Sequence, residues 1–438
     1  MSGTHAETVR FVRDTMLPEK APPLSAVGPI GWARNNLFAG WMNTLLTIGS
    51  IFVIYWVLVE ILPWIFQSSW TANSLSECRE QIAAAYGEGT SGACWAVIRE
   101  RYLQLIYGFY PSELYWRPSL AFILLIVAVA PVLFERVPRV LLYLTGLYPF
   151  IGAWLMWGGS IWMPIAALLG FVIGYALLVL VSPRAGPILG VILAVAGAIL
   201  WWMFAMGPVV QELEQAMPIG IEPVESRAFG GFMLSILIGV TAIVGSLPLG
   251  IILALGRQSD LFIVKSLCVG FIEFIRGVPL ITLLFVASTL LNVFLPPGTN
   301  FDIILRVMIM VTLFAAAYMA EVVRGGLAAL PTGQYEAADA LGLDYWKAQR
   351  LIIMPQALKI SIPGIVSTFI GVFKDTTLVS IIGLLDPLGL TNAIRADTNW
   401  NGIVWELYGF IALLFFVFCF SMSRYSMYLE RKLQTGHR

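Results

Sequence analysis

Apolar runs of about 18 residues or more recur along the chain, and each is long enough to cross a bilayer as a helix. The composition agrees, since 59% of the residues are hydrophobic and only 12% are charged, whereas soluble domains carry about 25% charged residues. The sequence therefore predicts an all-α, polytopic membrane protein with about ten spans, or eight or nine if segments broken by Gly and Pro are re-entrant. The predicted spans are 41–66, 118–134, 140–157, 164–182, 187–206, 230–256, 277–295, 303–323, 361–385 and 405–425.

The distribution of Lys and Arg predicts the orientation of the chain. With the N-terminus in the cytoplasm, most of the 26 Lys and Arg residues fall in cytoplasmic segments, as the positive-inside rule requires. The C-terminus is then also cytoplasmic, and the long loop 67–117 lies outside. The net charge of zero gives no indication of a nucleic-acid partner.

Cys78 and Cys94 both lie in the loop 67–117. A disulfide between them would close a short loop and stabilise it in an oxidising space. Two unpaired thiols are the alternative.

The N-terminal and C-terminal parts of the chain differ in their charge, Gly and Pro patterns. We expect an N-terminal segment, 1–40, a transmembrane extension, 41–225, and a core, 226–430. The extension has almost no charge within its spans, whereas the core carries nearly all patterns that combine Gly, Pro and charge.

The stretch "GQYEAADALGLDYWKAQRLIIMPQAL" (333–358) reads as two soluble helices between membrane spans. Thr332 can cap a first helix, and Gly342 suits the left-handed residue that ends it. Asp344 can cap a second helix, which we expect Pro355 to stop. Because the stretch follows a span that ends in Arg324, we expect a cytoplasmic helix–turn–helix. An ordinary interfacial amphipathic loop is the alternative.

The spacing of this stretch resembles the cytoplasmic loop of permease subunits of bacterial ABC importers. Met354 stands where Leu is usual, which keeps the apolar volume. The resemblance implies that the loop 324–358 forms coupling helices, which dock into a groove on an ATPase subunit. The residues that carry it are Glu336, Ala337, Ala338, Gly342, Ile352 and Pro355.

Further motifs are similar to the polar amino-acid branch of these permeases: "IEFIRGVPLI" (272–281), "AAYMAEVVRGGL" (316–327) and "FKDTTLVSIIG" (373–383). "NNLF" (35–38) and "YPSELYWRP" (110–118) resemble an enlarged subgroup that serves general L-amino-acid importers or importers of glutamate, glutamine, aspartate and asparagine. The resemblance implies a type I permease core in the bacterial inner membrane. It also implies three kinds of partner: a homologous second permease, two ATPase subunits that bind ATP-Mg, and a periplasmic amino-acid-binding protein.

Lys374, Asp375, Thr376 and Thr377 lie at or near membrane depth. Ionisable residues there are costly unless paired, and they often mark function. A zwitterionic amino acid would suit Lys374 for its carboxylate and a threonine hydroxyl for hydrogen bonds. A structural ion pair or gate is the alternative.

Glu321 and Arg324 lie three residues apart on one helix face. They could form a local pair that anchors the helix, a contact to the partner permease, or a latch that moves with the coupling helices. Arg276, Gly277 and Pro279 mark a helix break or start. A hinge is one interpretation of this motif, and snorkelling of Arg276 is the other.

The sequence has no GxxxxGK[ST] loop, so we expect this chain to bind no nucleotide or other cofactor. Its two histidines are His5 and His437, and its cysteines lack metal-site spacing, which argues against a metal site and against a membrane enzyme. The remaining alternative is a self-contained secondary transporter. That class predicts several paired carboxylates in the membrane, and the chain offers few.

Overall fold

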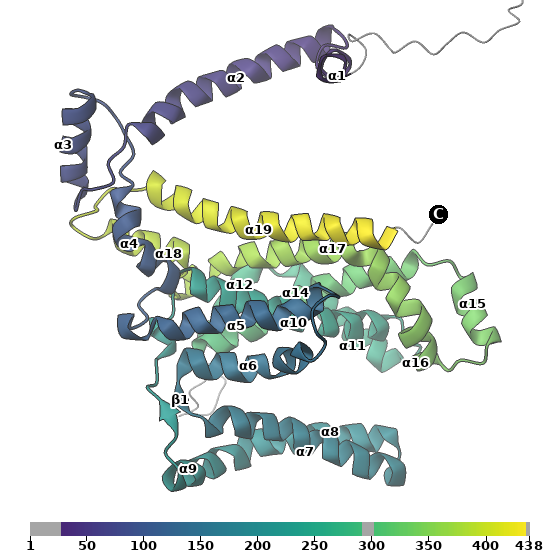
Figure 1. Ribbon diagram of the computed structural model, residues 1–438. Helices are drawn as coiled ribbons and strands as arrows, with labels where there is room; N and C mark the ends of the chain where they lie inside the picture. Colours follow the sequence, from purple (N-terminus) through teal and green to yellow (C-terminus); the bar gives the residue numbers. More distant parts are fainter. Residues whose placement is uncertain (1–27, 291–301, 435–438) are drawn as a thin grey trace, which may run out of the picture. The chain divides into compact units, whose positions relative to one another are not determined.

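Helices make up almost all of the computed structural model, which describes residues 28–290 and 302–434 (Figure 1). Most of the predicted segment 1–40 and the last residues of the predicted span 277–295 lie outside the described residues. The chain divides into two compact units. One contains the residues up to 69 together with 79–93, and the other contains 70–78 and 94–438. The boundary between the units thus runs through the loop 67–117.

The first unit contains α1 (Gly28–Asn36) and α2 (Trp41–Phe66). α2 has the bounds of the first predicted span, and Glu60 is its single charged residue. The backbone N–H of Ala93 donates to the carbonyl of Trp64 at 2.8 Å, and that of Ser69 donates to the carbonyl of Ala93 at 3.1 Å. The end of the segment 79–93 therefore returns to the end of α2. α3 (Leu75–Tyr86) crosses the boundary between the units.

The rest of the extension belongs to the second unit. Its elements are α4 (Ala96–Tyr107), η1 (Ser112–Leu114), α5 (Trp116–Leu133), α6 (Leu141–Trp157), β1 (Gly159–Ser160), α7 (Trp162–Ala185), α8 (Pro187–Leu200), the π-helix η2 (Trp201–Ala205), α9 (Met206–Ala216) and β2 (Gly220–Ile221). β1 pairs antiparallel with β2, with Gly159 opposite Ile221. α7 and α8 approach closely through small residues, since a Cβ on Gly174 would lie 3.2 Å from the carbonyl oxygen of Ala194.

The core follows in the same unit. Its elements are η3 (Ser226–Ala228), α10 (Gly231–Arg257), α11 (Phe262–Gly277), α12 (Leu280–Phe285), the π-helix η4 (Val286–Leu290), α14 (Ile303–Ala328), α15 (Gly333–Ala340), α16 (Tyr345–Ala348), the π-helix η5 (Gln349–Ile353), α17 (Met354–Asp375), η6 (Thr376–Ile382), α18 (Pro387–Arg395) and α19 (Trp405–Gln434). α15 and α16 lie at one end of the long helices, and α4 and α18 lie at the other (Figure 1).

Within the described residues, eight helices are long and apolar enough to cross a membrane. The pair Phe262–Gly277 and Leu280–Thr289, bent by 102°, adds a ninth if it forms one span. α6 is a shorter apolar helix of 17 residues. These helices correspond to the ten predicted spans. Hydropathy did not predict α11, the first half of the bent pair, because Lys265, Glu273 and Arg276 interrupt its apolar residues.

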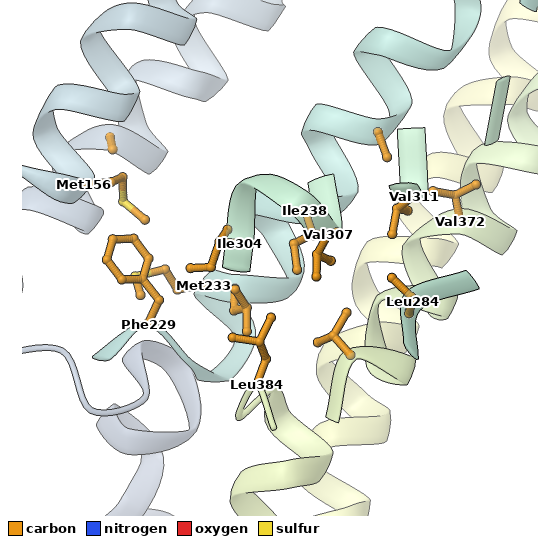
Figure 2. Packing of buried hydrophobic residues seen from close by; sticks show 14 of the residues in the cluster. Met156, Phe229, Met233, Ile238, Leu284, Ile304, Val307, Val311, Val372 and Leu384 are labelled. Carbon is orange, nitrogen blue, oxygen red and sulfur yellow. The ribbon is translucent and has the colours of Figure 1, made fainter. Parts of the chain in front are cut away.

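One hydrophobic cluster joins the extension to the core. Met156 at the end of α6 lies beside Phe229, which precedes α10, and the cluster continues to Ile304 of α14 and Leu384 (Figure 2). The rings of Trp157 and Phe229 stack with their centroids 4.8 Å apart. Close packing of this kind holds helices together in lipid, where the hydrophobic effect between helices is lost. The last turn of α6 is therefore packed together with the core.

Candidate functional site

The stretch 333–358 forms the predicted helix, glycine turn and second helix. α15 ends at Ala340, and Gly342 has a φ of +69°, the left-handed conformation that glycine adopts without strain. The Asp344 carboxylate accepts the backbone N–H of Lys347 at 3.0 Å and so caps α16. The Lys347 ammonium lies 2.9 Å from the same carboxylate, and its hydrogen bond lowers the pKa of Asp344 from the ordinary value. The sequence therefore predicted both the turn at Gly342 and the Asp344 cap correctly.

Two details of the predicted helix pair are wrong. Thr332 is itself helical in backbone conformation and makes no side-chain capping bond. Pro355 does not stop the second helix, because α16 continues through η5 into α17, with Pro355 in the first turn of α17. A π-turn shifts the hydrogen-bonding pattern, and proline is tolerated in a first helical turn because its missing N–H has no partner there. The loop and the following span are thus one continuous helical path.

The residues of the loop motif differ in exposure. Ala338 is buried and Ile352 is half-buried, whereas Glu336, Ala337, Gly342 and Pro355 are exposed. The loop also presents large apolar side chains that the motif does not include. These are Leu341, Tyr345, Trp346 and Leu351, each more than half exposed.

Glu321 gathers three arginines around one carboxylate. Its Oε1 lies 2.5 Å from Arg257 of α10 and 3.6 Å from Arg276 of α11, and its Oε2 lies 2.9 Å from Arg324. Arg257 also pairs with Glu273 at 3.0 Å. The pair with Arg324 is one of the three alternatives that the i,i+3 spacing left open. Arg257 and Arg276 were missed, since no local pattern indicates partners on other helices.

The motif at 276–279 forms the bend between α11 and α12. Gly277 is the last residue of α11, and Pro279 precedes the first residue of α12 with an extended ψ of 138°. The two helices meet at 102°. The Arg276 guanidinium lies over the Tyr318 ring of α14, 5.6 Å from its centroid. The helix break predicted at these residues is present, and α14 contacts it through both Glu321 and Tyr318.

Lys374, Asp375, Thr376 and Thr377 lie where α17 passes into η6. Lys374 is exposed and Asp375 is half-buried, and within the described chain neither belongs to an ion pair. Thr376 is fully buried, and its hydroxyl donates to the carbonyl of Phe373 at 2.8 Å. The Thr377 hydroxyl donates to the carbonyl of Lys374 at 2.9 Å. In this conformation, Lys374 is the side chain of the four that is most available to a ligand.

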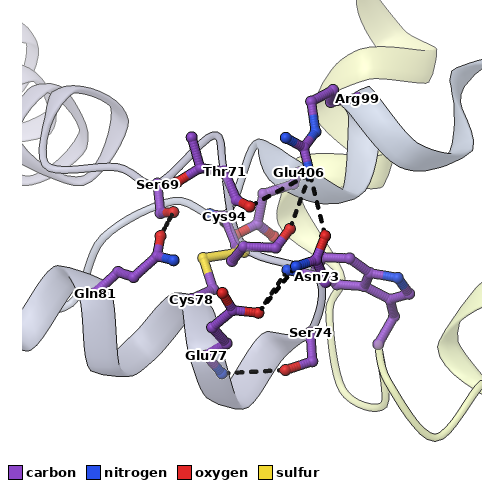
Figure 3. The surroundings of a disulfide bond; sticks show 12 residues. Ser69, Thr71, Asn73, Ser74, Glu77, Cys78, Gln81, Cys94, Arg99 and Glu406 are labelled. Carbon is purple, nitrogen blue, oxygen red and sulfur yellow. Dashed lines mark hydrogen bonds between the residues drawn. A yellow bond between two sulfur atoms is a disulfide. The ribbon is translucent and has the colours of Figure 1, made fainter.

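The loop before α4 is fastened to the core. Cys78 and Cys94 form a disulfide, with their Cα atoms 6.0 Å apart. The backbone N–H of Cys94 donates to the Glu406 carboxylate of α19 at 2.8 Å (Figure 3). Arg101 of α4 lies 2.5 Å from Asp397, in the segment between α18 and α19. The sequence suggested the disulfide as one of two alternatives, but no sequence pattern indicates these long-range polar contacts.

Among residues 28–290 and 302–434, no three His, Cys, Asp or Glu side chains are arranged to hold a metal ion. The second unit is a bundle of helices, most of them long and apolar enough to cross a membrane, with one broken helix pair. A helix–turn–helix extends from one end of the bundle and exposes apolar side chains. These features define a polytopic helical membrane protein.

Residues 246–435 match the family described as binding-protein-dependent transport system inner membrane component. The chain is 59% identical over 429 residues to the glutamate/glutamine/aspartate/asparagine transport system permease protein BztC of Rhodobacter capsulatus, covering 98% of this chain and 99% of the relative. It is 41% identical to the inner membrane amino-acid ABC transporter permease protein YhdY of Escherichia coli, covering 92% and 93%. The chain therefore belongs to this family of inner membrane components, the permease subunits of ABC transporters.

Among solved structures, the chain is similar to the crystal structure of an amino acid ABC transporter with histidines. The sequences are 30% identical, the TM-score is 0.41, and the match covers 46% of this chain and 91% of that chain.

Proposed function

We propose that this chain is the permease of an ATP-driven importer for glutamate, glutamine, aspartate and asparagine, or for a broader range of polar L-amino acids. The observation that carries the proposal is the 59% identity to BztC over almost the whole of both chains. That identity includes the extension as well as the core, and a shared extension supports a shared kind of importer.

The α15–α16 loop is the docking element for the ATPase. Trp346 is 70% exposed and Leu341 is 73% exposed, and Tyr345 lies beside Trp346 with the ring centroids 5.3 Å apart. Exposed aromatic and aliphatic side chains of this kind become anchors when a partner buries them. Each of two ATPase subunits would bind ATP-Mg and close on ATP, and this chain would bind neither ATP nor magnesium itself.

The remaining assembly consists of a homologous second permease, which makes the pore a heterodimer, and a periplasmic binding protein that delivers the amino acid. The chain lies in the bacterial inner membrane with both termini in the cytoplasm. The distribution of Lys and Arg supports this orientation. So does the disulfide in the loop 67–117, because disulfides persist in an oxidising space.

The translocation path passes Lys374. Its ammonium is exposed and has no carboxylate partner among the described residues, so it can attract the carboxylate of an amino acid. Asp375 is the adjacent negative group. Thr376 is buried in this conformation, so it would reach a ligand only after η6 has moved.

Purification of the intact complex tests the proposal. The chain would carry an affinity tag, and mass spectrometry would identify the bound proteins. The complex would then be reconstituted in vesicles with the binding protein and radiolabelled glutamate. We expect uptake to require both ATP and the binding protein. Uptake by this chain without an ATPase would instead indicate a secondary transporter.

A further inference from the structure

We infer that Glu321 is a positioning residue that transmits movement of the α15–α16 loop to the bend between α11 and α12. This inference rests on the proposed coupling role of the loop and adds the route by which the loop acts on the spans. Three features of the described core carry it: a close contact between α14 and α17, a charged cluster on α14, and the helix break beside that cluster.

The close contact makes one rigid base under the loop. α14 leads into the loop and α17 leads out of it. A Cβ on Gly326 would lie 2.5 Å from the carbonyl oxygen of Ala357 and 2.0 Å from Oγ of Ser361, so the two backbones touch. The Ser361 hydroxyl also donates to the carbonyl of Val322 at 3.2 Å. A force on the loop therefore moves the ends of α14 and α17 together.

The charged cluster connects this base to two other helices. Glu321 precedes Gly326 on α14 by about one and a half turns, and its side chain is only 17% exposed. It holds Arg257 of α10 at 2.5 Å and Arg276 of α11 at 3.6 Å. Packed apolar contacts resist sliding, whereas ion pairs at a partly exposed site break and re-form at small cost. The cluster is thus the exchangeable connection between α14 and its neighbours.

Arg276 is the member of the cluster that lies next to the bend. It immediately precedes Gly277, the last residue of α11 before the 102° bend. Arg276 is also the most distant of the three arginines from the carboxylate, and it rests on the Tyr318 ring as well. A shift of α14 moves Glu321 and Tyr318 together and therefore pulls on the residue next to the bend. Arg257 and Arg324 keep the carboxylate paired while Arg276 moves.

The test compares Glu321→Gln and Glu321→Asp in the full transport complex, reconstituted with ATPase and binding protein. Three quantities are measured: ATPase recovered with the tagged chain, basal ATP hydrolysis, and substrate taken up per ATP hydrolysed. We expect Glu321→Gln to leave ATPase recovery and basal ATP hydrolysis unchanged. It should lower uptake per ATP about tenfold, which lies within the usual range of coupling factors. Glu321→Asp keeps the charge and should restore most of the ratio.

Glu135→Gln is the matched control, because Glu135 pairs with Lys432 at 2.8 Å and neither residue belongs to the loop or to the bent pair. Its uptake per ATP should equal that of the unchanged protein. Should Glu321→Gln fail to insert, Arg276→Gln serves instead, since it leaves Glu321 paired with Arg257 and Arg324. It too should lower uptake per ATP.

If uptake per ATP were unchanged in Glu321→Gln or Arg276→Gln, the inference would be overturned. So would loss of the ATPase together with uptake in Glu321→Gln, because Glu321 would then act in docking. Failure of the proposed function has a different signature: the unchanged complex itself would take up substrate without ATP or without an ATPase.

Discussion

The Glu406 carboxylate accepts the backbone N–H of Cys94 at 2.8 Å, although 312 residues separate them in sequence. Glu406 is buried at the start of α19. Close by in the chain, the fully buried Trp400 donates its indole N–H to Glu100 of α4 at 3.2 Å. These contacts fasten Cys94 and α4 to the start of α19 and to the segment before it. The extension is thus connected to the core by specific polar contacts as well as by the apolar cluster.

The first prediction concerns the disulfide. Replacing Cys78 and Cys94 by Ser should lower the free energy of unfolding by about 3 kcal/mol, as expected for a closed loop of about 15 residues. The free cysteines Cys268 and Cys419 provide the control. Thermal unfolding in detergent, with and without a reductant, measures the effect. A reductant should lower the Tm of the unchanged protein and of the Cys268→Ser, Cys419→Ser variant, but not that of the Cys78→Ser, Cys94→Ser variant.

The second prediction concerns pH. Asp386 is fully buried and caps α18 by accepting the backbone N–H groups of Leu388 and Gly389. Burial raises the pKa of Asp386 from its ordinary value of 3.8 to about 6. Between these pH values the folded chain holds a proton that the unfolded chain has lost, so this group's contribution to stability falls as the pH rises. The loss amounts to at most about 3 kcal/mol.

Asp386→Asn removes this titration and keeps a capping oxygen. Its Tm relative to the unchanged protein should therefore increase as the pH rises from about 4 to about 7. Asp344→Asn is the opposite case, because Lys347 lowers the pKa of Asp344. A lowered pKa acts below the ordinary value of 3.8, so the Tm of that variant relative to the unchanged protein should fall as the pH rises toward 3.8 and stay level from about 4 to about 7. Parallel curves for Asp386→Asn and the unchanged protein would contradict the prediction.

The third prediction concerns the turn of the coupling loop. Gly342 has a positive φ with open space around its Cα, so a side chain there meets strain rather than a clash. Gly342→Val should disturb the turn, because β-branched residues are poorly tolerated at positive φ. We expect less ATPase to co-purify while the permease still inserts. Gly333→Val is the control, since Gly333 also has open space and lacks the positive φ. Equal recovery of ATPase with both variants would remove Gly342 from the coupling role.

Much of the fold was predictable because its signals are local. Apolar runs located the spans, and the turn at Gly342 with its Asp344 cap followed from residues within one or two turns. α11 was missed because its charges interrupt the hydropathy signal, although it packs as half of a bent pair. The partners of Glu321 and Glu406 were missed for a different reason. They lie on separate helices, and only the tertiary arrangement of α10, α11 and α14, or of α4 and α19, brings them together.

The last prediction concerns Lys374, the exposed cation where α17 passes into η6. Lys374→Met keeps much of the apolar stem and removes the charge, so helix packing should be retained. If the ammonium attracts the substrate carboxylate, uptake of both acidic and neutral amino acids should fall, since both kinds carry that carboxylate. Basal ATP hydrolysis should stay unchanged, because Lys374 lies at the far end of α17 from the loop. Lys359→Met, on the same helix near the loop, is the matched control for charge removal. Normal uptake by Lys374→Met would exclude this residue from the translocation path and favour a structural role for the motif.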